Sequence, residues 1–123
     1  MTRWIVDGMN VIGSRPTGWW RDRPGAMRDL VEELEAFAGR GGDQVTVVLD
    51  GKPFDLEGHA VDVRFASRRG RNAADDDIAA LVAGDGEPGD LSVVTSDADL
   101  ARRVRDAGAA VVGAGEFRRL LDG

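Results

Sequence analysis

Four acidic positions in this sequence have the residue type and spacing that a reactive site needs. Asp7, Asp50 and Asp97 each follow a short apolar run, and Asp75 opens an acidic cluster at residues 75–77. In an open parallel sheet the carboxyl ends of the strands lie at one edge, where ligands bind. Carboxylates gathered there repel one another, so a cation is their natural partner. Hard oxygen ligands select Mg²⁺, Mn²⁺ or Ca²⁺, and the pattern therefore predicts a divalent-metal site.

Each acid also has a simpler explanation when it is taken alone. Asp50 and the following glycine form a possible turn, and Asp75 and Asp97 are possible helix N-caps. Helical phase separates the members of the clusters. Asp75 and Asp97 share faces with apolar side chains and are expected to point inward, whereas residues 76 and 77 point progressively away. Asp99 is expected to pair with Arg103, four residues later.

Composition narrows the chemistry. The 123 residues contain no cysteine and one histidine, His59, which we interpret as an ordinary loop residue. This excludes disulfides, zinc sites built on several His and Cys, and a Cys nucleophile, and it suits a reducing cytoplasm.

No apolar run reaches about 18 residues, so no membrane span is expected. The N-terminus reaches an acid too early for a signal peptide. The net charge is −6, which is not typical of a tight nonspecific nucleic-acid binder.

The order of elements predicts one doubly wound α/β domain over residues 1–123, with a central, mainly parallel sheet flanked by helices. Expected strands cover residues 3–7, 45–49, 61–65, 91–95 and 109–112. Expected helices cover 24–38, a segment from the acidic cluster to the break at 84–89, a segment from 96 to 107, and 116–121. Residues 7–10 are expected to form a tight turn and 14–25 a loop. Strand 61–65 alternates apolar and polar residues, which predicts an edge position.

Two segments have the composition of an RNA contact. Trp19 and Trp20 lie beside arginines, and aromatic rings next to guanidinium groups stack bases and hold phosphates. The alternative is that one or both rings pack on the core. Arg68, Arg69 and Arg71 immediately precede the acidic cluster and are expected to guide an RNA backbone.

Four motifs resemble those of NYN domains in the PIN-like nuclease superfamily, particularly the YacP-like branch. They are residues 7–13 (Asp-Gly-Met-Asn-Val-Ile-Gly), 47–51 (Val-Val-Leu-Asp-Gly), 74–78 (Ala-Asp-Asp-Asp-Ile) and 94–97 (Val-Thr-Ser-Asp). Their order and approximate spacing hold over nearly the whole chain. The resemblance implies a PIN-like fold and a metal-dependent endoribonuclease that uses Mg²⁺ or Mn²⁺ on RNA. It also implies association with translating ribosomes.

The resemblance assigns roles residue by residue. It implies a catalytic and metal-binding set of Asp7, Asp50, Asp75 and Asp97, with Asn10 orienting the site, Thr95 and Ser96 in support, and Asp76 as a second-rank acid. The expected chemistry is metal-assisted hydrolysis that leaves a 5′-phosphate and a 3′-hydroxyl.

The chain departs from the family pattern at two points. Met9 replaces the more usual aromatic residue of Asp-Gly-Tyr-Asn, and the longer C-terminal helical part of YacP-like proteins does not follow the last short helix. The second departure bears on ribosome docking more than on catalysis.

Three other functions remain to be weighed: a noncatalytic RNA-binding PIN-like domain, a PIN-type toxin and a haloacid dehalogenase-type phosphatase. Such toxins usually open with Asp-Thr/Ser-Asn, and the phosphatase needs Asp-x-Asp where this chain has Met9.

Overall fold

Five parallel strands form the central sheet of the computed structural model, which describes residues 2–70 and 72–123. Arg71, one of the predicted RNA-binding arginines, lies outside the described residues. The strands are arranged in the order β3-β2-β1-β4-β5, and every neighbouring pair is parallel. Their bounds are β1 (Arg3–Asp7), β2 (Gln44–Leu49), β3 (Val61–Phe65), β4 (Leu91–Val94) and β5 (Ala110–Val112). The predicted single α/β domain with a parallel sheet is confirmed.

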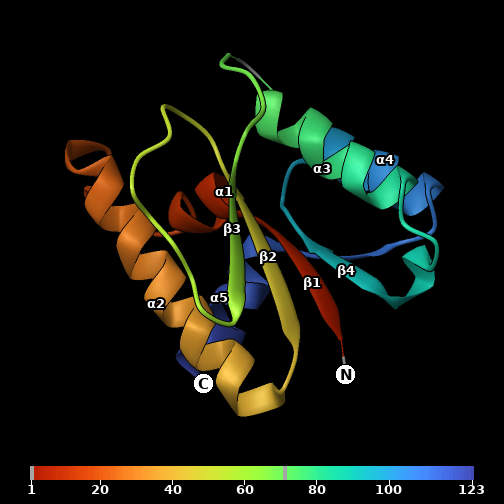
Figure 1. Cartoon of the computed structure of the whole chain (residues 1–123), viewed down its shortest axis with the longest axis horizontal. Coiled ribbons are helices and arrows are strands. Elements are labelled where there is room, and N and C mark those ends of the chain that lie inside the picture. Colours follow the sequence, from red (N-terminus) through yellow and green to blue (C-terminus); the bar gives the residue numbers. More distant parts are fainter. Residues whose placement is uncertain (1, 71) are drawn as a thin grey trace.

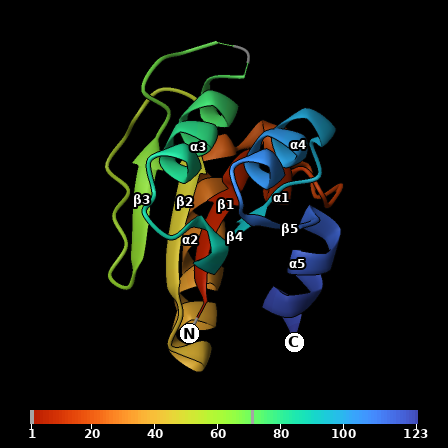
Figure 2. The same ribbon diagram turned by 90° about the vertical axis from the view of Figure 1, so that its right-hand side faces the viewer.

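Helices cover both faces of this sheet (Figure 1). On one face pack α1 (Gly8–Ile12), α2 (Arg23–Gly41) and α5 (Ala114–Asp122), and on the other α3 (Ala73–Ala83) and α4 (Ala98–Asp106). Figure 2 shows α3 and α4 side by side on their face. Two short 3-10 helices, η1 (Trp19–Arg21) and η2 (Pro88–Asp90), complete the elements. Side-chain alternation along β1 places Val6 in one core and Ile5 in the other.

Strand β3 lies at the edge of the sheet, as its alternating sequence predicts. Asp62 and Arg64 are exposed, whereas Val61 is buried. Strand β2, between β3 and β1, is an apolar run whose last residues, Val47 to Leu49, are buried on both faces.

Residues 8–12 form the short helix α1 where the sequence predicts a tight turn. Val11 and Ile12 are buried, so the helix is stabilised by the core rather than by its own length. Gly8 permits this close packing, because a Cβ at this position would lie 2.5 Å from Leu49 Cδ2. The motif after Asp7 is therefore a short helix rather than a turn.

Helix boundaries also differ from the sequence-based expectation by one to three residues, and two of the differences have a clear structural reason. Helix α2 continues past Gly39 to Gly41, because the left-handed turn that ends it lies at Gly42, with φ 66°. Helix α5 begins at Ala114 instead of 116, because the Ser96 hydroxyl accepts a hydrogen bond of 2.9 Å from the Ala114 N–H.

The strand order places a ligand-binding crevice between β1 and β4. The chain proceeds from β1 outward through β2 to β3, and then crosses to β4 and β5 on the other side of β1. In open α/β sheets the crevice outside the carboxyl ends of the strands at such a reversal is where ligands bind. Among the described residues, no helix is long and apolar enough to cross a membrane.

Candidate active site

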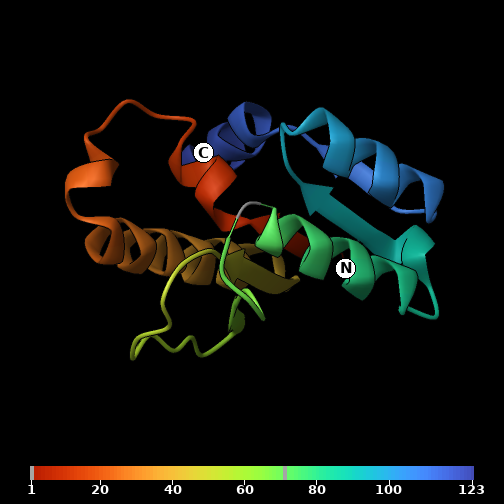
Figure 3. The ribbon, with the colours of Figure 1, turned by 90° about the horizontal axis from the view of Figure 1, so that it is seen from above.

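A pocket of about 240 Å³ opens at this crevice, and four aspartates line it. Asp7 ends β1, Asp50 follows β2, Asp97 follows β4, and Asp75 lies in the first turn of α3. Viewed from above, the short α1 helix lies in the middle of this edge with the start of α3 near it (Figure 3). The remaining lining residues are Met9, Asn10 and Asn72. The fold therefore brings the acids predicted from four separate motifs to one place.

Among residues 2–70 and 72–123, pockets of about 340 and 350 Å³ are larger than this one. The first lies between β3 and α3 and contains one acid, Asp77. The second lies by the segment before α2, beside Trp19, Asp22 and Asp29. Neither is at the carboxyl edge between β1 and β4. The acid-lined pocket is identified as the candidate site by its chemistry and position rather than by its size.

Asp7 is the most buried acid of the pocket, with 5% of its surface exposed. The pKa of Asp7 is raised from the ordinary 3.8 to about 7, mainly by burial and also by the negative charges of Asp75 and Asp50. The Thr95 hydroxyl and the Asn10 backbone N–H oppose this shift. A carboxyl group that is partly protonated near neutral pH becomes fully ionised when a cation is bound next to it.

Thr95 and Asn10 join β1, α1 and β4 at the site. Thr95 Oγ1 donates a hydrogen bond of 3.0 Å to Asp7 Oδ2, and the same oxygen accepts one of 3.1 Å from the Asp97 N–H. Asn10 Oδ1 accepts a bond of 2.8 Å from the Ser96 N–H. Thr95 therefore orients the buried carboxylate directly. The Ser96 hydroxyl instead holds the first turn of α5, and only the backbone of Ser96 faces Asn10.

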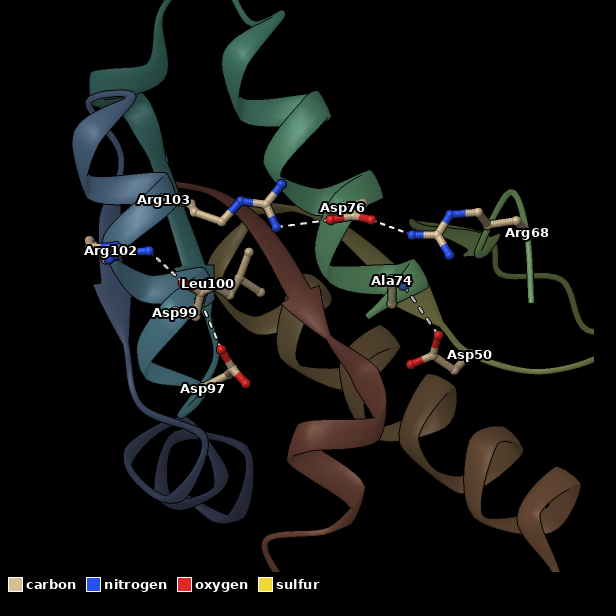
Figure 4. A network of polar contacts seen from close by, with 9 residues as sticks. All are labelled: Asp50, Arg68, Ala74, Asp76, Asp97, Asp99, Leu100, Arg102 and Arg103. Atoms are coloured by element: carbon tan, nitrogen blue, oxygen red, sulfur yellow. Dashed lines mark hydrogen bonds and ion pairs between the residues drawn. The ribbon is translucent and has the colours of Figure 1, made fainter. Parts of the chain in front are cut away.

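Asp50 and Asp97 each use one oxygen to cap a helix. Asp50 Oδ1 accepts a bond of 3.2 Å from the Ala74 N–H in α3, and Asp97 Oδ1 accepts one of 2.8 Å from the Leu100 N–H in α4 (Figure 4). Asp97 is thus an N-cap, as the simpler explanation of this acid predicted, and it also lines the pocket. Asp75 does not serve as the N-cap of α3, since Asn72 occupies that position.

Asp75 interacts electrostatically with the three other acids of the pocket. Burial raises its pKa, and the charges of Asp97 and Asp50 add to that effect, while the Arg103 guanidinium opposes it. Together with the effects of Asp75 and Asp50 on Asp7, every acid of the pocket acts on at least one other. Such mutual repulsion is relieved by a cation or by protons.

The donor set fits a hard divalent cation. The pocket offers carboxylate and amide oxygens, which Mg²⁺ and Mn²⁺ prefer, and its linings include no sulfur of cysteine or ring of histidine. Within residues 2–70 and 72–123, no three acids or histidines stand at the spacing of ligands to one ion. Binding an ion through three carboxylates therefore requires these side chains to move closer together.

The neighbours of Asp75 in its acidic cluster lie outside the pocket. Asp76 binds Arg68 and Arg103, and Asp77 accepts bonds of 2.6 Å from the Ser67 N–H and 2.7 Å from its hydroxyl. Neither residue lines the acid pocket.

The expected pairing of Asp99 with Arg103 is wrong. Asp99 binds Arg102 at 2.5 Å, because Arg103 turns toward α3 and binds Asp76 at 3.0 Å (Figure 4). Arg103 thus pairs with Asp76, which is distant in the sequence, instead of with Asp99, the partner that helix spacing indicated.

The two tryptophans lie away from the acids. Trp19 packs on the core, whereas Trp20 is 56% exposed and meets Trp19 edge-on at 6.0 Å between ring centroids. Arg23 lies over the Trp19 ring and Arg21 over the Trp20 ring. Of the other predicted RNA contacts, Arg69 is exposed in the segment before α3. None of these residues lines the acid pocket.

Three residues near the site were not assigned to it by the sequence. Met9 and Asn72 line the pocket, and Arg103 acts electrostatically on Asp75. Asn72 has a left-handed backbone, with φ 62°, which asparagine tolerates better than most residues. The signal that pointed to it was its place just ahead of the acidic cluster, separated from Asp75 by Ala73 and Ala74.

Comparison with known proteins shows which fold and which family the chain shares. No curated protein matches the chain significantly. The fold is similar to the crystal structure of Rae1 (YacP) from Bacillus subtilis, with a TM-score of 0.82, 26% identity, and coverage of 99% of this chain and 74% of that one. A single-substitution mutant of Rae1 gives a TM-score of 0.83 at 26% identity, covering 99% of this chain and 76% of that one. A family model described as YacP-like NYN domain matches residues 4–123, and the chain therefore belongs to the YacP-like NYN domain family.

Proposed function

We propose that this chain is a divalent-metal-dependent endoribonuclease that hydrolyses RNA phosphodiester bonds at the acid pocket. The observation that carries the proposal is the meeting of Asp7, Asp50, Asp75 and Asp97 at the crevice between β1 and β4. The YacP-like NYN domain is a nuclease-type family, which supports RNA as the substrate. Catalysis that depends on carboxylates suits a chain with a single histidine.

In this proposal each residue has a defined task. Asp7, Asp50, Asp75 and Asp97 hold Mg²⁺ or Mn²⁺. When bound, the ion lowers the pKa of water and neutralises charge on the scissile phosphate and on the leaving oxygen. The expected products carry a 5′-phosphate and a 3′-hydroxyl.

The surrounding residues position the acids. Thr95 fixes the orientation of Asp7, and Asn10 ties α1 to the segment after β4, so that Asp7 and Asp97 keep their relative placement. Rigid support of this kind matters because small displacements of catalytic groups have large effects on rate.

The proposal is tested by incubating the protein with structured and unstructured RNA in Mn²⁺, Mg²⁺ or chelator. Asp7→Asn is the test variant, and Asp99→Asn is the matched control, since Asp99 is exposed and pairs with Arg102 outside the pocket. We expect cleavage that requires metal, is lost in Asp7→Asn and persists in Asp99→Asn. Folded protein that binds RNA but cuts none of it with either ion would support the noncatalytic RNA-binding alternative.

A finer proposal concerns the form of the RNA. The family resemblance implies action on ribosome-bound mRNA in the cytoplasm, and we propose the same for this chain. Cleavage of one mRNA is compared with and without translating ribosomes, under otherwise identical conditions. Equal rates and equal cleavage sites in both reactions would remove the ribosome from the proposal without affecting the nuclease activity.

A further inference from the structure

Asp76 holds two arginines that come from different parts of the chain. Its Oδ1 lies 3.0 Å from Arg103 Nη1 on α4, and its Oδ2 binds Arg68 Nη2 in the segment after β3. Figure 4 shows the carboxylate between the two guanidinium groups, which extend to either side of the first turns of α3. One negative charge thus positions two positive charges.

Both guanidinium groups keep capacity for another ligand. The side chains of Arg68 and Arg103 are 53% and 35% exposed, and that of Asp76 is 44% exposed. A guanidinium group carries several N–H donors in a fixed plane, and the contacts with Asp76 engage one terminal nitrogen of each arginine. The remaining donors match the geometry of a phosphate group.

The two arginines do not line the acid pocket, but the residue that binds both is next in sequence to Asp75, which does line it. Arg103 is close enough to Asp75 for its charge to lower the pKa of that carboxyl group, and Asp76 directly follows Asp75 in α3. The pocket itself presents four carboxylates, which repel an RNA backbone on either side of the reacting phosphate. An RNA strand that crosses α3 to reach the acids therefore passes the two arginines, whose positive charges can hold its phosphates.

We propose that Arg103 and Arg68 form a phosphate-binding pair that holds the RNA backbone next to the acid pocket, with Asp76 as the residue that positions both. This inference rests on the proposed function, because the ligand is the RNA that the pocket would cut. Arg103 is the new binding residue. Asp76 acts through the arginines, which differs from the metal-binding role considered for it from the sequence.

The experiment measures binding of a single-stranded RNA oligonucleotide to the full chain in chelator, over a range of salt concentrations. Arg103→Gln is compared with Arg102→Gln, its neighbour on α4, which is 70% exposed and pairs with Asp99. We expect Arg103→Gln to weaken binding about tenfold, as loss of a charged hydrogen bond would. The slope of log affinity against log salt should fall by about 0.7, the value for one phosphate contact on a single strand. Arg103→Lys should keep that slope.

A double-mutant cycle tests the role of Asp76. Removal of its charge alone would strengthen RNA binding, whereas loss of positioning weakens it. We expect Asp76→Asn to weaken binding, and Arg103→Gln to have a much smaller effect in the Asp76→Asn background than in the wild type. Thermal melting of each variant verifies that the protein is folded. Additive effects, or tighter binding by Asp76→Asn, would overturn the positioning role.

The outcome is distinguishable from failure of the proposed function. Wild-type protein that cuts no RNA but binds it through Arg103 would contradict the nuclease and support the phosphate-binding pair. Wild-type protein that cuts RNA, with Arg103→Gln and Arg102→Gln equal in affinity and salt slope, would overturn the pair alone. Wild-type protein that does not bind RNA would overturn the pair as well.

Discussion

The two ends of the β-sheet treat their aspartates in opposite ways. At the amino ends of the strands, Arg3 binds Asp85 through two hydrogen bonds of 2.8 and 3.0 Å, and this pairing lowers the pKa of Asp85 to about 2. At the carboxyl ends, Asp7 is buried near other acids and its pKa rises to about 7. An aspartate is thus paired with an arginine at the amino edge, whereas at the carboxyl edge an aspartate lies near other aspartates.

A second aspartate repeats the pattern at the amino edge. Asp43 accepts hydrogen bonds of 3.0 Å from the Thr2 N–H and 3.1 Å from the Trp4 indole, and these bonds lower its pKa. Asp85 and Asp43 at the amino edge therefore have their charges compensated within the fold. At the carboxyl edge four aspartates share one pocket, and we propose that a divalent cation compensates their charges.

The largest expected effect is on catalysis at the carboxyl edge. Asp7→Asn should lower the RNA cleavage rate about a thousandfold, because several kcal/mol of metal-assisted stabilisation would be lost. Asp85→Asn, at the opposite edge, should leave the rate unchanged. Single-turnover cleavage of one labelled RNA measures both variants. Similar losses in the two variants would erase the functional difference between the edges.

The second effect is a gain of stability. The folded-state pKa of Asp7, about 7, is above the ordinary 3.8, so the native state binds the proton more tightly than the unfolded state. The stability that protonated Asp7 contributes to the folded state is fully present below about pH 4 and is lost as the pH rises to about 7. In chelator at pH 8, Asp7→Asn should therefore be more stable than wild type by about 1 to 4 kcal/mol.

Urea unfolding of wild type and Asp7→Asn at pH 4 and pH 8 measures this difference. The two proteins should approach each other in stability at the lower pH. A variant that is less stable than wild type at both values would show that Asp7 is satisfied within the fold without a cation.

A smaller effect is expected at the hydroxyl that supports Asp7. Thr95→Val removes the hydrogen bond that lowers the pKa of Asp7, so that the carboxyl group ionises at a higher pH. We expect cleavage to fall about tenfold, as is typical for groups that orient metal ligands, and its pH profile to shift upward. Thr95→Ser keeps the hydroxyl and should behave as the wild type. Equal pH profiles in the two variants would remove Thr95 from the site.

The smallest effect concerns the amino edge. The pKa of Asp85 is depressed, so the stability from its pairing with Arg3 is present above about pH 4 and is lost as pH falls toward 2. Asp85→Asn should lower the melting temperature slightly at pH 7, and the difference from wild type should shrink between pH 4 and pH 2. A difference that grows with acid would contradict this sign.

Much of this arrangement could be predicted from the sequence because the strands carry strong local signals. The β-branched run before Asp50 and the run before Asp97 each mark a buried parallel strand, and parallel strands bring their following residues to one edge. Because the predicted sheet is mainly parallel, the meeting of the acids at one edge followed from the topology. The phase of α3 likewise indicated that Asp75, rather than its neighbours, points into the pocket.

Contacts between distant segments could not be predicted in the same way. Helix α1 has five residues and is too short for a periodic pattern, so only its burial against the core reveals it. Arg103 binds Asp76, 27 positions away in the chain, and no local spacing indicates that choice over Asp99. The hydrogen bond from Thr95 to Asp7 also depends on the pairing of β1 with β4.

The central claim is that the acids of the carboxyl edge form a cation site, and calorimetric titration of Mn²⁺ at pH 7 tests it most directly. Wild-type protein should bind Mn²⁺ and release protons, because Asp7, with a pKa of about 7, must ionise fully. Titrations in two buffers of different ionisation enthalpy measure the proton release, and Asp7→Asn should bind more weakly and release fewer protons. Absence of Mn²⁺ binding by folded wild-type protein, or equal affinity and proton release in both proteins, would contradict the account.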